Sequence, residues 1–160
     1  MSDKVLLKLV GLKKHFDSPQ GKVKAVDGVD LEVYDGETLG LVGESGCGKS
    51  TLVRATLRLI EPSEGKVFFR GEDVTGYDKR RLLEIRGKMG LVFQDPHSSL
   101  NPRMTVSDIL KRPLKIHDLV NDDGEIYDRT VSLLETMGLS AEHMIRYPHE
   151  LSGGQKQRVG

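Results

Sequence analysis

The sequence predicts an α/β fold in which a strand-rich first half precedes a largely helical second half. Short apolar runs separated by glycine-containing turns fill residues 5–42, a pattern typical of β-strands. A glycine-rich loop at 43–51 follows the apolar run 38–42 and leads into a helical pattern that begins at Lys49. Residues 105 to about 138 have mostly helical spacing. These observations place both kinds of element in one chain.

The composition excludes several classes of protein. The 160 residues suffice for about one domain, and 24 basic residues balance 24 acidic ones. This net charge of zero argues against a protein that binds nucleic acid through positive charge alone. The single cysteine, Cys47, excludes an internal disulfide and a thiolate zinc site. The five histidines lack metal-ligand spacing and are interpreted as surface or capping residues. No run approaches the ~18 apolar residues of a membrane span.

The first elements are expected to be strands. Apolar residues recur with strand character at 5–12, 25–33 and 38–42, and a turn separates the last two runs. From Lys49 the apolar side chains recur three and four positions apart. This spacing predicts a helix, which Pro62 terminates.

Beyond Pro62 the pattern alternates and then becomes helical. The expected elements are a strand at 66–69, a helix at 79–86, a buried strand at 89–93 and helices between 105 and 138. Pro113 and the turn at 121–124 are expected to interrupt the last helical region. Loop-forming residues predict subdomain boundaries near Gln94 and near Pro148.

The glycine-rich loop is the most specific feature of the first half. It matches the pattern G-x-x-x-x-G-K-[ST] and lies between an expected strand and an expected helix. Its residues are Gly43, Glu44, Ser45, Gly46, Cys47, Gly48, Lys49, Ser50 and Thr51. Glycines let the backbone N–H groups approach an anion, Lys49 can reach the β- and γ-phosphates, and the Ser50 hydroxyl can bind Mg²⁺. The alternative is a plain glycine-rich turn, which does not require the ordered Gly-Lys-Ser. The loop predicts a nucleoside triphosphate site.

A second glycine-rich element lies near residue 152. Ser152 and Gln155 have the spacing of a capping box, so a helix is expected to begin there. Gly153 and Gly154 just inside that start would each cost about 1 kcal/mol relative to alanine. They are explained if a second phosphate packs against the helix start. One nucleotide needs only one phosphate loop, which suggests a nucleotide held between two chains.

Together these motifs resemble the ATP-binding cassette (ABC) ATPases. The phosphate loop, Gln94 after an apolar run and the sequence Leu-Ser-Gly-Gly-Gln at 151–155 match the family over essentially the whole chain. Segments 40–47, 93–106 and 147–150 resemble the cassettes of bacterial and archaeal peptide (dipeptide, oligopeptide) importers, and nickel importers share much of this. The resemblance implies a P-loop NTPase core with an N-terminal antiparallel β subdomain and a helical subdomain. The parallel sheet would be incomplete within these residues.

The resemblance also implies roles for individual residues. Phe16 would stack on adenine, although a strand-end core aromatic is the alternative. Gln94 would sense Mg²⁺ and the γ-phosphate and couple to the membrane partner, so Lys49 and Gln94 would be the catalytic residues here. Ser50 and Gln94 would bind Mg²⁺. Residues Ser152, Gly153, Gly154 and Gln155, the signature element, would contact ATP bound to another subunit.

The same resemblance implies an organisation and partners. Residues 1–94 would form the ATP-binding core, 95–147 the helical subdomain that contacts the permease, and 148–160 the signature element with the start of its helix. The cofactors would be ATP and Mg²⁺. The partners would be transmembrane permease subunits, a second ABC ATPase subunit (identical or different) and, indirectly, an extracytoplasmic solute-binding protein. The protein would lie peripherally at the cytoplasmic face of the membrane and import peptides.

One part of the family's machinery does not occur in these 160 residues. Hydrolysis in the family needs an apolar strand ending in Asp-Glu after the signature, and the only nearby pair, Glu72-Asp73, is reversed and lies too early. We therefore expect the N-terminal part of a longer cassette, poorly stable and weakly nucleotide-binding alone. Two alternatives stay open: a catalytically incomplete nucleotide-binding or regulatory module, and a cassette ATPase outside transport.

Overall fold

The computed structural model describes residues 4–93, 99–120 and 122–160, which form two compact units. Unit 1 comprises Met1–Met89 and unit 2 comprises Gly90–Gly160. Sequence reasoning places the boundary near Gln94, which lies outside the described residues. Each unit has its own hydrophobic core, so each is described by itself.

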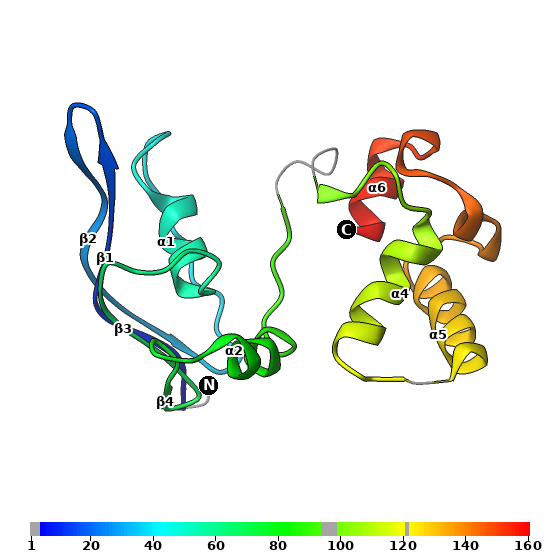
Figure 1. Ribbon diagram of the computed structural model, residues 1–160, viewed down its shortest axis with the longest axis horizontal. Helices are drawn as coiled ribbons and strands as arrows, with labels where there is room; N and C mark the ends of the chain where they lie inside the picture. Colours follow the sequence, from blue (N-terminus) through cyan, green and yellow to red (C-terminus); the bar gives the residue numbers. More distant parts are fainter. Residues whose placement is uncertain (1–3, 94–98, 121) are drawn as a thin grey trace. The chain divides into compact units, whose positions relative to one another are not determined.

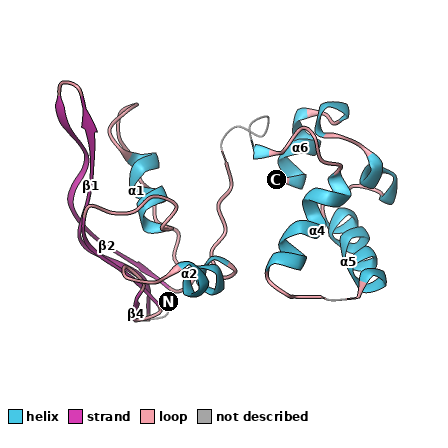
Figure 2. Cartoon of the chain, in the orientation of Figure 1, coloured by secondary structure: helices cyan, strands magenta, loops and turns pink. Residues whose placement is uncertain are grey.

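Unit 1 is built on an antiparallel sheet (Figures 1 and 2). Its strands are β1 (Val5–Ser18), β2 (Gly21–Tyr34), β3 (Glu64–Phe69) and β4 (Glu72–Asp73). They lie in the order β2-β1-β3-β4, and each neighbouring pair is antiparallel. The expected strands 5–12 and 25–33 therefore exist but are longer, because they pair along most of their length as one hairpin.

Helix α1 (Lys49–Thr56) packs against β1 and β2 (Figure 1). Its Leu52 and Ala55 join Leu9, Leu12 and Val67 in the core of the unit. The sequence predicts a longer helix, but α1 ends at Thr56 because Arg58 adopts a left-handed backbone conformation with φ of +52°. Helix α2 (Lys79–Arg86) has the predicted bounds, and the Asp78 side chain caps it by accepting the Arg81 N–H.

Two expected strands do not form. Residues 38–42 and 89–93 have no strand pairing, and apolar side chains in both segments are exposed, including Val42 at 95% and Val92 at 77%. A strand exists only where a neighbour accepts and donates its backbone hydrogen bonds. Within the described residues the only sheet is the antiparallel one of unit 1, and neither segment belongs to it.

Unit 2 is helical. It contains α4 (Val106–Ile116), α5 (Asp123–Thr136), the short 3₁₀ helices η1 (Ala141–Ile145) and η2 (Pro148–Glu150), and α6 (Gly153–Val159). Helices α4 and α5 lie side by side (Figure 1). The side chains of Val106, Leu134, Leu151 and Val159 belong to one hydrophobic core. The expected interruption at Pro113 is wrong, because Pro113 lies inside α4. The buried residues of α4 and its Thr105 capping box hold the helix through the proline.

Candidate nucleotide-binding site

The glycine-rich loop leads directly into α1. Gly46 and Gly48 have φ of +82° and +98°, a left-handed conformation that side-chain-bearing residues adopt with strain. Gly48 is the N-cap of α1, so the helix begins at Lys49. The left-handed glycines therefore turn the chain from the loop into the helix.

Gly48 also presses the loop against the sheet. A Cβ atom at this position would lie 2.0 Å from the carbonyl oxygen of Ala25 in β2. Only glycine permits that approach. Because Val23 in the same strand pairs with Phe16 of β1, the end of the hairpin that carries Phe16 lies next to the loop.

The Lys49 side chain turns back into the loop. Its Nζ donates hydrogen bonds to the carbonyl oxygens of Gly43 and Glu44, each at 2.6 Å, and lies 3.6 Å from the Cys47 sulfur. A Cβ atom at Gly43 would lie 2.8 Å from that sulfur, so the Cys47 side chain would have to shift. The loop therefore closes around a positive charge.

The backbone of the loop offers donors. The N–H of Cys47 donates to the Glu44 carbonyl at 3.3 Å, but those of Gly46, Gly48 and Ser50 have no acceptor among the described residues. The start of a helix adds a partial positive charge to such donors. Ser45 and Ser50 are exposed and Thr51 is half-buried. Free N–H groups around a lysine fit a phosphate chain.

Phe16 lies at the exposed end of the β1–β2 hairpin. Its side chain is 41% exposed, so it is not the core aromatic that the alternative interpretation requires. The Lys14 Nζ lies 4.9 Å from the centre of its ring. A partly exposed aromatic ring can stack on a planar ligand.

The sequence predicts Ser50 and Gln94 as Mg²⁺ ligands. Gln94 lies outside the described residues. In the segments that the structure describes, no group of three or more His, Cys, Asp or Glu side chains could hold a metal ion. The hydroxyl of Ser50 is the remaining candidate ligand of the loop, and Mg²⁺ bound to a nucleotide needs few protein ligands.

The second glycine-rich element begins α6 as the sequence predicts. The Ser152 hydroxyl accepts the Gln155 N–H at 3.3 Å, and the Gln155 side chain accepts the Ser152 N–H at 2.9 Å. Gly153 and Gly154 are exposed, and added Cβ atoms would meet open space. Nothing in the described part of unit 2 requires glycine at these two positions. The Gln155 side chain also contacts the His143 ring at 3.1 Å.

Sequence reasoning missed the polar contacts around the Phe16 strand. His15, interpreted as a surface or capping residue, is only 17% exposed and contacts Asp27 at 3.0 Å. Hydrogen bonds from Lys24 and then from His15 hold the pKa of the Asp27 carboxyl below its usual value. Arg58 was missed as well: it is 5% exposed, and its guanidinium donates to the carbonyls of Val74 and Thr75. The His15 contact depends on the register of β1 and β2, and the Arg58 contact joins segments 16 and 17 residues apart, so the local sequence gives no signal for either. His143, in contrast, does cap, at Ser140.

Comparison with protein families finds a match to the family described as ABC transporter over residues 26–160. OppF, the oligopeptide transport ATP-binding protein of Bacillus subtilis (strain 168), is 56% identical over 156 residues, which are 97% of this chain and 51% of that protein. OppF of Salmonella typhimurium (strain LT2) is 45% identical over 166 residues, 98% of this chain and 50% of that protein. The chain thus spans about half the length of these curated relatives.

Solved structures give a similar result. The dimeric ATP-binding cassette MJ0796, in a post-hydrolysis state bound to ADP and Pi, matches with a TM-score of 0.84 and 30% identity, over 96% of this chain and 66% of that one. CbiO1 of Clostridium perfringens, described as part of the ABC transporter complex cbiONQ, matches with a TM-score of 0.74 and 27% identity, over 98% of this chain and 59% of that one.

Proposed function

This chain belongs to the ABC transporter family of ATPases, and from that membership we propose that loop 43–51 binds the phosphates of Mg-ATP. The observation that carries the proposal is the Lys49 amino group, 2.6 Å from two loop carbonyls, in a loop whose Gly46, Gly48 and Ser50 N–H groups have no acceptor among the described residues. A fixed positive charge beside oriented donors stabilises a polyphosphate.

The proposed roles follow the chemistry of the side chains. Lys49 binds the β- and γ-phosphates, Ser50 and Gln94 hold Mg²⁺, and Phe16 orients the adenine ring. Bound Mg²⁺ neutralises charge that develops on the transferred phosphoryl group. Glycines 43, 46 and 48 let the loop backbone approach the phosphates, and Lys49 is the catalytic cation among the described residues.

The signature element is proposed to act on a nucleotide bound to a second cassette, identical or different. The exposed glycines of α6 support this, because they leave backbone N–H groups at a helix start accessible from outside the unit. MJ0796, to which the chain is similar, was solved as a dimer with ADP and Pi.

We further propose peptide import as the process that ATP drives. The support is the identity to two oligopeptide transport ATP-binding proteins. The proposed partners are transmembrane permease subunits contacted by the helical subdomain 95–147, with a solute-binding protein acting indirectly. None of the described helices is long and apolar enough to cross a bilayer. We propose a peripheral position at the cytoplasmic face of the membrane.

Turnover is proposed only for a chain that also contains the Asp-Glu strand of the family. These 160 residues lack that pair, which favours a second candidate function for them alone: nucleotide binding without hydrolysis. ATPase activity of the 160-residue chain, measured beside that of a longer version, separates the two.

The test of the binding site is calorimetric titration of Mg-ATP into the chain and its Lys49→Ala variant. Loss of a charge-assisted contact is expected to weaken binding about tenfold or more. Lys88→Ala, which removes an exposed lysine away from the loop, is the control and should bind as the wild type does. Equal affinity of the Lys49 variant and the wild type would reject the loop as the phosphate site.

A further inference from the structure

The strand that carries Phe16 loses one neighbour shortly before it reaches that residue. The ladder between β1 and β3 ends at the pair Lys13 and Glu64. From Lys14 to Ser18, β1 is paired with β2 alone. A strand segment held from one side is free to bend away from its sheet unless something else holds the open side.

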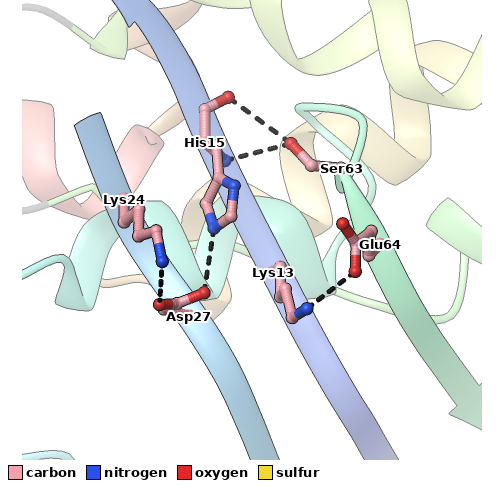
Figure 3. Close-up of polar contacts among 6 residues, drawn as sticks. All are labelled: Lys13, His15, Lys24, Asp27, Ser63 and Glu64. Atoms are coloured by element: carbon pink, nitrogen blue, oxygen red, sulfur yellow. Dashed lines mark hydrogen bonds and ion pairs between the residues drawn. The ribbon is translucent and has the colours of Figure 1, made fainter. Parts of the chain in front are cut away.

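Ser63 holds that open side. The His15 N–H donates to the Ser63 hydroxyl oxygen at 3.0 Å, and the hydroxyl donates to the His15 carbonyl at 3.4 Å (Figure 3). The Ser63 N–H donates to the Lys13 carbonyl at 2.8 Å. One side chain therefore satisfies both backbone groups that a further ladder partner would satisfy.

The β2 side of the same residue is irregular. The β1–β2 register shifts between Lys14 and His15, which marks a bulge, and bulges re-aim the side chains next to them. The His15 ring reaches across to Asp27, which the Lys24 amino group also contacts at 3.1 Å (Figure 3). His15 is therefore fixed through its backbone on one side and through its ring on the other.

We propose that Ser63, through its two hydrogen bonds to the His15 backbone, is a positioning residue that sets Phe16 for the nucleotide base. This inference rests on the proposed function, in which Phe16 orients adenine. Ser63 lies seven residues beyond Thr56, the end of α1, so it joins the segment after the phosphate-loop helix to the strand of Phe16. Ser63 thus links the segment after α1 to the strand of Phe16 through its backbone N–H and its hydroxyl group.

The experiment compares two ligands on the full chain. Mg-ATP uses both the loop and the base platform, whereas magnesium tripolyphosphate uses the loop only. Ser63→Ala is expected to weaken Mg-ATP binding about three- to tenfold, the effect of one or two hydrogen bonds, and to leave tripolyphosphate binding unchanged. Ser63→Thr keeps the hydroxyl and should keep the affinity. The matched control is Ser18→Ala, which should bind both ligands as the wild type does. Among the described residues, the Ser18 hydroxyl accepts the Gln20 N–H within the hairpin turn.

A double-mutant cycle with Phe16→Ala isolates the positioning effect. If Ser63 acts through Phe16, adding Ser63→Ala to Phe16→Ala should lower Mg-ATP affinity no further. Equal weakening of both ligands by Ser63→Ala would show a general structural role and overturn the inference. An unchanged Mg-ATP affinity of the Ser63→Ala variant would also overturn the inference. If Phe16→Ala still weakens Mg-ATP binding in that case, the proposed function remains. If Phe16→Ala has no effect on Mg-ATP binding but Lys49→Ala does, the base platform is wrong and the inference falls with it.

Discussion

A side chain at position 48 would meet the backbone of β2, since its Cβ would lie 2.0 Å from the Ala25 carbonyl oxygen while φ stays at +98°. Gly46 has a similar φ of +82°, but an added Cβ there would meet open space. Substitutions at Gly46 and Gly48 can therefore distinguish two physical effects. Strain in the backbone acts at both positions, and loss of the contact with the sheet acts at Gly48 alone.

Gly48→Ala should lower the free energy of unfolding by about 2–4 kcal/mol, because left-handed strain and a displaced backbone contact add. Gly46→Ala should cost about 1–2 kcal/mol from strain alone. Gly76→Ala, with no positive φ and open space at Cβ, is the control and should change little. Urea unfolding followed by circular dichroism measures all three. Equal costs for Gly46→Ala and Gly48→Ala would show that the approach to Ala25 is unimportant.

At the scale of elements, Ser152 at the start of α6 has two roles: it caps the helix, and it is proposed to contact a nucleotide bound to a second subunit. The Ser152 capping box stabilises a seven-residue helix whose Val159 is buried in the core of unit 2. The same helix start exposes Gly153 and Gly154, the proposed contact with a second subunit's nucleotide. A substitution that keeps the cap but adds negative charge separates these roles.

Ser152→Ala should lower the free energy of unfolding by about 1 kcal/mol, because it removes the cap. Ser152→Asp should keep the stability, since aspartate caps as well as serine does. Its carboxylate should nevertheless repel a phosphate at the helix start and abolish ATP-dependent dimerisation. Urea unfolding gives the stabilities, and light scattering with a non-hydrolysable ATP analogue gives the mass. Dimerisation of the Asp variant at the wild-type ATP concentration would contradict the role in binding.

Elements determined by neighbours in sequence were predictable, and those determined by distant partners were not. Helix α2 has the predicted bounds because its cap, Asp78, is adjacent to it. The start of α6 follows the same rule at Ser152. The end of α1 was mispredicted, because the buried Arg58 side chain, bound to the β3–β4 region, fixes the left-handed turn that ends the helix. Spacing of apolar residues cannot reveal such a contact.

The same distinction applies to the site. The phosphate loop is contiguous, so its geometry at Gly48 and Lys49 follows from local sequence. The apolar runs 38–42 and 89–93 look like strands, but pairing depends on which segment lies beside them. Ser63 and His15 are 48 residues apart in sequence, and their contact depends on the register of β1 and β3. No pattern within either segment encodes that register.

At the scale of the whole molecule, the carboxyl groups with a lowered pKa determine how stability depends on pH. All described carboxyl groups with a lowered pKa lie in unit 1: Asp27, Glu32, Glu64 and Asp73. Hydrogen bonds lower each pKa, from Lys24 for Asp27, from Lys8 for Glu32, from Lys13 for Glu64 and from Thr75 for Asp73. Because the folded pKa lies below the unfolded one, each group stabilises the fold above the unfolded pKa.

That stabilisation should disappear as the pH falls from the ordinary values of 4.5 for Glu and 3.8 for Asp through the lower folded values. Unit 1 is therefore expected to lose stability as the pH falls through this range. Methyl NMR signals of buried residues, Leu12 in unit 1 and Leu134 in unit 2, measure this between pH 7 and pH 2.5. Asp73→Asn should reduce the acid sensitivity of unit 1, whereas Asp128→Asn, on the exposed side of α5, should not. Equal acid sensitivity of unit 1 with and without Asp73→Asn would show that the contacts of Asp73 do not control its acid unfolding.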